Sequence, residues 1–523
     1  MGTPCSPFSV AGGGEEPVIR ILPRASPERG GARVPIPTFS VAGGGEEPLL
    51  HPPLLSEQRS RRDPRIAPPL PREARSAAAR ARGRSEELSI PMVLERSGVR
   101  EEGSVTYDLR KAEYWDVADL RKEMERVFDI CHGCRRCYNL CPSFNVLLDT
   151  LDEQEVEVEE LAPSVYDEVV DLCYQCKLCD PHCPYTPPHR WQIDFPRLML
   201  RARAVRARRE GVSFSDKVLG KTDLIGKVGT LLSPLMNWAN RNPLSRFVME
   251  RITGIHRERN LPPYATESFA RWFAARRPEP PKSPVARVAL FETCSVNYNY
   301  TEVGKATVAV LAHNEVEVVR PSQVCCGMPA LDGGDTDEAL RKIQANVASL
   351  HPWVEKGYDI VVPGPTCSYM LKKEYPVLHP SPESEQVASH TFDLCEYLMK
   401  LREAGKLKTD FKHAPGKITY QLPCHLRVQN IGFKSRDLLS TIPGAKVRMI
   451  ERCSAVDGTW GLKKEYYETS LELAGKLFHE VEAEEAELVV SDCSLAGLQI
   501  TQGTKRKVLH PIEVVARAYG LIE

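Results

Sequence analysis

The sequence predicts a multidomain protein in which a helical, cysteine-rich segment is followed by two tandem α/β domains. Two closely spaced runs of cysteine fall between residues 131 and 183. Beyond Val285, short β-branched runs alternate with helical stretches, and the whole pattern occurs twice. A chain of 523 residues with 42% hydrophobic side chains is long enough for three such parts, since domains average about 150 residues.

The first 91 residues differ in composition from the rest of the chain. They are rich in Pro, Gly, Ala and Arg, contain no Lys, and repeat the decapeptide FSVAGGGEEP at Phe8–Pro17 and Phe39–Pro48. Such a composition cannot bury a core. We therefore expect residues 1–91 to be a disordered leader or an over-extended start with Met92 as the true beginning, rather than an Arg-rich targeting tail.

Helices are expected to carry both cysteine runs. Apolar residues recur at helical spacing from Leu120 to Ile130 and lead directly into Cys131. The segment Pro163–Leu172 begins with proline and ends just before Cys173, as a helix would. A helical domain is predicted over residues 107–196.

The two cysteine runs share the spacing C-x2-C-x2-C-x3-C-P. Three cysteines at these intervals can wrap one face of a four-iron cubane, while the fourth points toward a neighbouring cluster. Crossed ligation is therefore predicted. The first [4Fe-4S] cluster is assigned to Cys131, Cys134, Cys137 and Cys183, and the second to Cys173, Cys176, Cys179 and Cys141. Zinc would instead favour two separated C-x2-C pairs. The spacing indicates a ferredoxin-type module that moves electrons one at a time.

Residues 197–280 are expected to form a helical, amphipathic linker. Several arginines between 197 and 209 precede apolar residues that recur at amphipathic spacing from Val218 to Trp238. Such a stretch can lie on an anionic membrane leaflet. The alternatives are that it packs across the two α/β domains or fills the groove of a partner.

The two α/β domains are predicted at residues 285–405 and 415–520. The strands are VALF, EVEVV and DIVV in the first domain, then KITYQL, KVRMI, ELVV and KVLH in the second. Each domain repeats a cysteine pattern, with Cys294, Cys325, Cys326 and Cys367 in the first copy and Cys424, Cys453 and Cys493 in the second. Cys395 lies in a helical pattern and is expected to be a buried small hydrophobe, whereas Cys5 lies in the leader and is discounted.

This cysteine pattern, with CCG at 325–327, resembles the CCG domain of heterodisulfide reductase and its relatives. The order of parts over residues 107–520 is most similar to the family of the C-subunit of anaerobic glycerol-3-phosphate dehydrogenase. The segments GPTCSYMLKKEYP, LPCHL and DGTWG carry the resemblance. It implies that the CCG region binds a further iron-sulfur cluster and exchanges electrons with quinone, a disulfide or a partner.

The two copies depart from the family motif in different ways. The family ends each copy with C-x-x-C, but Met370 and Ala496 occupy the final positions here, and Ser454 replaces the second cysteine of the pair. The first copy keeps four thiolates, enough for a cluster. The second keeps three, so it is expected either to hold a cluster with an open or non-Cys position, for which His425 is the nearest candidate, or to be a degenerate copy kept for packing.

Composition excludes several functional classes. A net charge of −1 gives no electrostatic reason to bind nucleic acid. The 17 cysteines at metal-binding spacings indicate a reducing compartment. No stretch approaches the ~18 apolar residues of a membrane-spanning helix, and no secretory signal is evident. We expect a cytoplasmic protein that attaches peripherally to the inner face of the membrane if the linker binds lipid.

The predicted function is electron transfer within a flavin-linked, respiratory-type dehydrogenase. No G-x-G-x-x-G follows a strand, so a flavin is expected on a separate flavoprotein subunit. Electrons would cross the two ferredoxin clusters and leave through the CCG region toward a membrane quinone. The alternatives are a soluble carrier serving a peroxide-reducing or other redox partner, and a heterodisulfide reductase-like enzyme, which the missing fifth cysteines disfavour.

Overall fold

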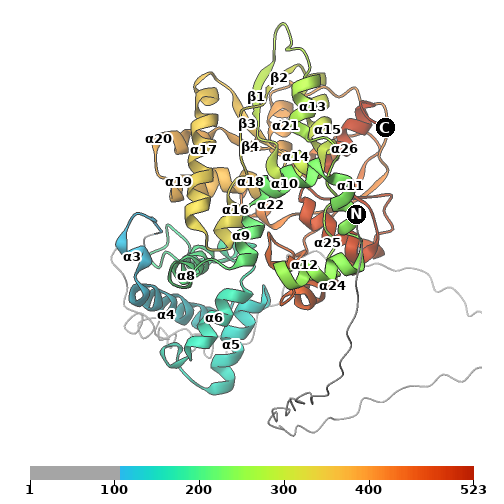
Figure 1. Cartoon of the computed structure of the whole chain (residues 1–523). Coiled ribbons are helices and arrows are strands. Elements are labelled where there is room, and N and C mark those ends of the chain that lie inside the picture. The colour runs from blue at the N-terminus through green and yellow to red at the C-terminus, as the bar shows by residue number, and fades with distance from the viewer. Residues whose placement is uncertain (1–106) are drawn as a thin grey trace, which may run out of the picture. The chain divides into compact units, whose positions relative to one another are not determined.

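Helices carry the cysteine runs in the computed structural model, which describes residues 107–523 (Figure 1). The predicted leader at residues 1–91 lies outside the described residues. The described residues all belong to one unit by their internal contacts. The fold class predicted from the sequence, a helical ferredoxin-like region followed by two α/β CCG domains, is confirmed for this part of the chain.

Two helices deliver the cysteine runs. Helix α4 (Val117–Cys134) starts at Asp116, whose side chain accepts a hydrogen bond from the backbone, and it continues through the first two cysteines. Helix α6 (Pro163–Leu172) has proline at its first position and ends at Cys173, as predicted. The other helices of this region are α3 (Ala112–Trp115), α5 (Pro142–Gln154), η1 (Val158–Glu160), α7 (Cys179–His182) and α8 (Phe195–Glu210).

The linker is helical, as predicted, and one of its helices packs tightly on the first CCG copy. Its helices are α9 (Phe214–Gly220), α10 (Thr222–Leu231), α11 (Ser233–Ala239), α12 (Pro243–Thr253) and α13 (Phe269–Arg276). In α10, a Cβ added at Gly226 would overlap the ring of Tyr298, and one added at Gly229 would overlap the ring of Tyr264. Only glycine permits this approach, which anchors one face of α10.

Both CCG copies contain a four-stranded parallel sheet with the same strand order. The first sheet has the order β2-β1-β3-β4 and the second β6-β5-β7-β8. The strands are β1 (Ala286–Leu290), β2 (Val316–Val319), β3 (Asp359–Val362), β4 (Thr391–Asp393), β5 (Lys417–Gln421), β6 (Lys446–Ile450), β7 (Leu488–Val490) and β8 (Val508–Leu509). Strand β4 was not predicted, because Thr391–Asp393 contains a single apolar residue and therefore lacks the apolar run that marks the other strands.

Helices cover the two sheets, as parallel strands require. In the first copy they are α14 (Thr293–Tyr298), α15 (Thr301–His313), α16 (Met328–Asp332), α17 (Thr336–Glu355), α18 (Pro365–Tyr369), η2 (Met370–Glu374), α19 (Tyr375–Leu378), α20 (Pro382–Ser389) and α21 (Leu394–Glu403). In the second they are α22 (Cys424–Arg427), α23 (Lys434–Leu439), η3 (Trp460–Leu462), α24 (Tyr467–Ala483), α25 (Ser494–Thr504) and α26 (Pro511–Tyr519).

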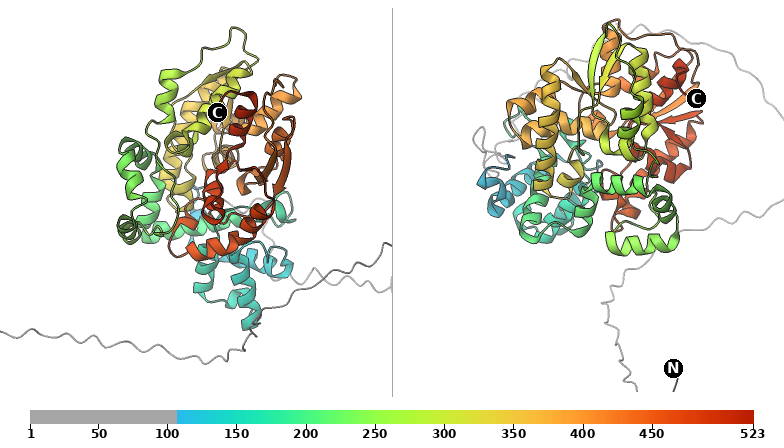
Figure 2. Two further views of the ribbon diagram at one scale, coloured as in Figure 1. Left: turned by 90° about the vertical axis from the view of Figure 1, so that its right-hand side faces the viewer. Right: turned by 45° about the horizontal axis from the view of Figure 1, so that its top comes forward.

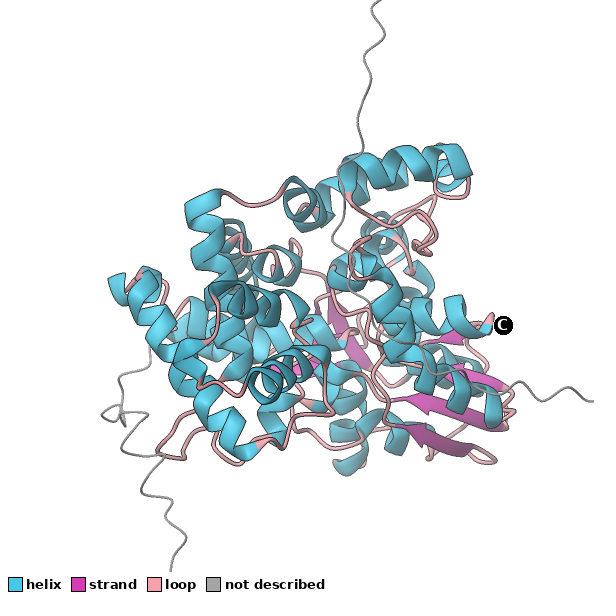
Figure 3. Ribbon diagram, turned by 90° about the horizontal axis from the view of Figure 1, so that it is seen from below, coloured by secondary structure: helices cyan, strands magenta, loops and turns pink. Residues whose placement is uncertain are grey.

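A single hydrophobic core joins the two copies. Buried side chains of both sheets and of α15 and α26 belong to it, and Figure 3 shows the strands lying within the helical layers. Cys395 on α21 is fully buried in this core, as expected for a small hydrophobe. The copies therefore hold each other in place, which matters for sites that depend on residues from both.

A buried arginine should be the most sensitive polar position of the helical region. Arg201 on α8 is fully buried, donates to the carbonyl oxygens of Glu113 and Tyr114, and pairs with Asp119 at 2.8 Å. Arg201→Met should lower the free energy of unfolding by about 2–4 kcal/mol, because these buried acceptors lose their partner. Urea unfolding followed by circular dichroism measures it. The exposed Arg209→Met is the matched control, and equal effects of the two changes would contradict the expectation.

Candidate iron-sulfur sites

The first thiol set brings together one cysteine run and the last cysteine of the other. Burial raises the pKa of Cys131, and the thiols of Cys137, Cys183 and Cys134 add to the increase. Burial likewise raises the pKa of Cys137 to about 11, again with contributions from Cys183 and Cys134. Cys183 thus lies with the first three cysteines of the preceding run, which is the grouping that crossed ligation requires.

The second thiol set has the complementary composition. Burial raises the pKa of Cys179, with further contributions from Cys176, Cys173 and Cys141 in that order. All four residues are buried. Cys137 of the first set also contributes to the pKa of Cys179, so the two sets are neighbours. Four converging soft thiolate donors in each set suit an iron-sulfur cluster.

In the first CCG copy, four thiols converge at the carboxyl ends of the strands. Cys294 follows β1, the pair Cys325–Cys326 follows β2, and Cys367 follows β3. Hydrogen bonds from Cys294 and Cys326 hold the pKa of Cys325 well below its ordinary value. Hydrogen bonding to Cys325 and to Cys367 raises the pKa of Cys326. The donor set again suits a cluster.

Helix α10 of the linker closes this first-copy thiol set. Both carboxylate oxygens of Asp223 lie 3.0 Å from the backbone nitrogen of Cys325, which donates to them. The Lys342 ammonium lies 3.5 Å from Asp223 and donates to the carbonyl oxygen of Gly220 at 2.9 Å. The linker therefore contacts the thiol set of the first copy directly, a relation that sequence spacing did not reveal.

The second CCG copy repeats the arrangement with three thiols, Cys424, Cys453 and Cys493, which follow β5, β6 and β7. The loop after β6 keeps its shape although its glycine is lost. Gly327 of the first copy has φ 99°, and the corresponding Ala455 has φ 50°, in the same left-handed region. Ala455 keeps this backbone conformation although it is strained for a residue with a Cβ atom. We infer that the second copy retains the loop geometry of a binding site.

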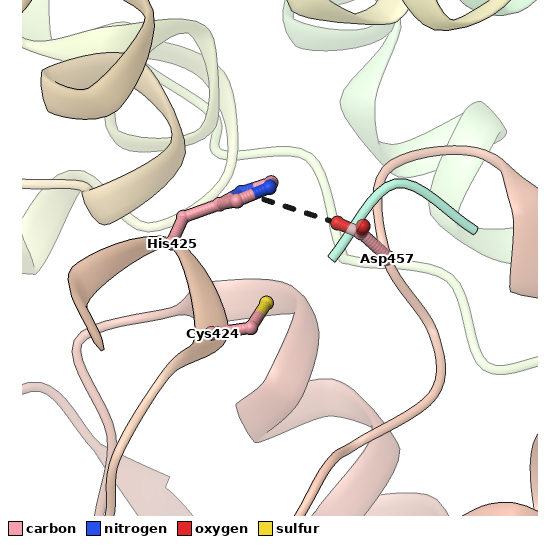
Figure 4. Close-up of side chains that lie close together, drawn as sticks. All are labelled: Cys424, His425 and Asp457. Carbon is pink, nitrogen blue, oxygen red and sulfur yellow. Dashed lines mark ion pairs between the residues drawn. The ribbon is translucent and has the colours of Figure 1, made fainter. Parts of the chain in front are cut away.

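A carboxylate joins the second-copy thiols. Burial raises the pKa of all three thiols, and the Asp457 carboxylate adds to the increase at each. In Figure 4 the Asp457 carboxylate faces the space shared with Cys424 and His425. Burial also raises the pKa of Asp457 itself to about 7. In the sequence, Asp457 was named only as part of the segment DGTWG. The available signal was that it lies four residues after Cys453, in the copy that has Ser454 in place of a cysteine.

His425 connects three of the thiol sets through hydrogen bonds. Its Nε2 lies 3.0 Å from the carbonyl oxygen of Gln175, which lies between Cys173 and Cys176, and its Nδ1 lies 2.9 Å from Oγ1 of Thr366. Because a carbonyl oxygen only accepts, Nε2 donates and Nδ1 accepts from Thr366. Burial lowers the pKa of His425 to about 4, so the ring is neutral near pH 7. Ligation of iron by His425 would require one of these bonds to break.

The second thiol set also contacts the second copy. The thiol of Cys453 donates a hydrogen bond to the hydroxyl oxygen of Tyr174, with 3.5 Å between Sγ and the oxygen. After burial, Cys453 makes the largest contribution to the raised pKa of Cys176. The ferredoxin-like region therefore meets the CCG region at the second copy.

Comparison with known proteins agrees with this arrangement. A family model described as "Cysteine-rich domain" matches residues 288–372 and 418–501, and one described as "Citrate utilization protein B Fer4-like domain" matches residues 124–209. The C-subunit of anaerobic glycerol-3-phosphate dehydrogenase of Escherichia coli K12 is 31% identical over 309 residues, covering 58% of this chain and 77% of that protein.

Two further relatives match smaller parts of the chain. Lactate utilization protein A of Geobacillus kaustophilus is 30% identical over 243 residues, which cover 44% of this chain and 98% of that protein. The B-subunit of fumarate reductase (CoM/CoB) of Methanothermobacter marburgensis is 28% identical over 249 residues, which cover 46% of this chain and 48% of that protein.

Double substitutions can test whether ligation is crossed. In the crossed arrangement, Cys131→Ala combined with Cys183→Ala damages a single cluster, so the pair should cost about four irons per chain. Cys131→Ala combined with Cys141→Ala should instead damage two clusters and cost about eight. Iron and sulfide analysis of anaerobically purified protein measures both. The opposite order of losses would establish uncrossed ligation.

His425→Gln should leave the iron content unchanged, because both ring nitrogens are already occupied by Thr366 and Gln175. Iron analysis measures it, with circular dichroism to verify folding. Cys424→Ala serves as the comparison that should lose iron. A folded His425→Gln protein with the iron content of Cys424→Ala would show that the imidazole is a ligand.

Proposed function

The chain belongs to the family of the C-subunit of anaerobic glycerol-3-phosphate dehydrogenase, whose members are iron-sulfur electron-transfer subunits of oxidoreductases, and we propose that it carries electrons from a flavoprotein partner to a membrane quinone. One observation carries the proposal. Four thiol sets lie in one compact unit and neighbour one another in series. The order is the first thiol set, the second thiol set, the second CCG copy and the first CCG copy, which helix α10 closes. A continuous series of this kind is what a relay between two separate redox partners needs.

The route follows the contacts between the sets. The second thiol set neighbours the first through Cys137 and the second copy through Cys453. The second copy reaches the first through the hydrogen bond between His425 and Thr366, which precedes Cys367. When bound, iron-sulfur clusters supply one-electron carriers at these sets. The protein holds them in order and buries all four thiols of the second set, while the thiols of the other sets are buried or partly buried.

An exposed apolar face on α10, α11 and α12, here called the linker face, supports the membrane part of the proposal. It consists of Leu224, Val228, Leu231, Leu232, Leu235, Trp238, Leu244, Phe247, Val248 and Ile252. Leu231 is 79% exposed and Leu244 is 72% exposed. These side chains are therefore not covered by the CCG domains, whereas the opposite face of α10 packs on Tyr298. Figure 2 (left) shows the linker helices, in green, along one edge of the described residues.

The charge of this segment suits an anionic lipid surface. Residues 214–253 contain six basic and three acidic side chains. Among the described residues, no helix is both long and apolar enough to cross a membrane. An amphipathic face with basic neighbours is typical of helices that lie in the interface instead. Because Asp223 ties α10 to Cys325, this face would bring the first-copy site close to a quinone in the bilayer.

Heterodisulfide chemistry has less support. The positions where the family carries its fifth cysteine are Met370 and Ala496. Both side chains are buried, and Met370 packs in the core of the first copy. No thiol from these positions is therefore available to a disulfide substrate.

Vesicle binding and quinone reduction test the proposal together. Wild-type protein should sediment with vesicles of phosphatidylcholine and phosphatidylglycerol. Leu231→Asp combined with Leu235→Asp should weaken binding at least about tenfold, because two leucine side chains no longer enter the interface. Val117→Asp, at an exposed apolar position on α4, is the control. Wild-type protein that stays in solution at low salt, and whose iron no quinol analogue reduces, would favour the soluble-carrier alternative.

A further inference from the structure

The second CCG copy has one protein ligand fewer than a cubane needs. Ser454 replaces the second cysteine of the pair, and Ala496 replaces the last cysteine of the motif. The three remaining thiols would leave one iron of a four-iron cluster without a protein ligand. A buried carboxylate, that of Asp457, lies beside Cys424 and His425.

We propose that the Asp457 carboxylate is the fourth protein ligand of an iron-sulfur cluster held by Cys424, Cys453 and Cys493. This inference rests on the electron-transfer function proposed above and adds a specific ligand to it. Ligand atoms of Asp457, Cys424 and His425 all lie within 4.8 Å of one another. Both nitrogens of His425 already form hydrogen bonds, to Thr366 and Gln175. Asp457 is therefore the residue of this group that can bind iron in addition to Cys424.

The hydrogen bonding of Asp457 supports the assignment. Its side chain is only 8% exposed, and its Oδ1 lies 4.0 Å from Nδ1 of His425. Its Oδ2 is buried and has no hydrogen-bond partner among the described residues. A buried carboxylate oxygen without a hydrogen-bond partner destabilises the folded protein, because it has lost its contacts with water. Coordination to iron would satisfy this oxygen.

Charge compensation by nearby cations is the competing explanation, because Lys177 and Arg203 both lower the pKa of Asp457 against the effect of burial. The Lys177 ammonium donates to the side-chain oxygen of Gln175 at 2.9 Å. Arg203 donates to the carbonyl oxygens of Val170, Cys173 and Asp332. Neither cation forms an ion pair with Asp457 in the described part of the chain, so neither satisfies Oδ2.

A carboxylate in place of a thiolate changes the chemistry available at that iron. Oxygen ligands are harder than thiolates and bind iron of a cluster less tightly. Asp457 also lines a cavity of about 190 Å³ together with Arg203 and Trp460. The iron bound by Asp457 would therefore be the one that a small molecule can reach, whereas the four-thiol set of the first copy offers no comparable position.

Substitutions at Asp457 and at a matched carboxylate test the proposal in the full chain, purified anaerobically. Cys453→Ala first identifies which components of the EPR and Mössbauer spectra belong to the second copy. Asp457→Ala should then convert this component to a three-iron species and remove about one iron per chain. Asp457→Cys should retain four irons with altered spectra. Asp332→Ala is the control, because Asp332 is a carboxylate on the same cavity with a buried oxygen that likewise has no hydrogen-bond partner among the described residues. No thiol is among the principal contributions to its pKa.

Each contrary result has a defined meaning. Unchanged iron content and spectra in Asp457→Ala would overturn the proposal, as would an equal loss in Asp332→Ala, which would indicate a general effect of the buried charges. If Cys453→Ala removes no spectral component from wild-type protein, the second copy holds no cluster and the proposal fails. Persisting signals from the ferredoxin-like sets and the first copy would show that the electron-transfer function stands in every one of these cases.

Discussion

The parallel order of three neighbouring strands is the constraint on which the CCG sites depend. In each copy the central strand lies between the other two, so the carboxyl ends of β1, β2 and β3, and of β5, β6 and β7, meet at one edge. Parallel strands are joined by long crossover connections. Cysteines that are far apart in the chain therefore reach the same place without any local signal between them, and one cysteine position after each strand is enough to build a site.

Burial governs the thiols once they are assembled. It raises the pKa of most of the ligand candidates, so the unliganded thiols are neutral near pH 7. Metal binding must then displace protons, which couples assembly of the clusters to pH and to folding. Cys325 is the exception, because thiol hydrogen bonds from Cys294 and Cys326 stabilise its thiolate.

The two copies share a fold but differ in what covers and completes their thiols. The first copy has four thiols and is closed by Asp223 of the linker. The second has three thiols, meets the ferredoxin-like helices at Tyr174, and borders a cavity through Asp457. Duplication has thus produced one enclosed site next to the linker face and one more open site at the junction with the helical region.

The sequence by itself determined the cysteine runs, the limits of helix α6 and the duplicated α/β pattern, because each of these is a local spacing of residue types. It could not supply β4, because Thr-Phe-Asp contains only one apolar residue. Nor could it supply the exposure of the linker face, since an amphipathic helix has the same sequence pattern whether its apolar side is covered or bare. Only the tertiary structure decided the roles open to His425 and Asp457. His425 binds the carbonyl oxygen of Gln175, 250 residues away, and contacts between such distant residues depend on how separate elements pack rather than on any pattern along the chain.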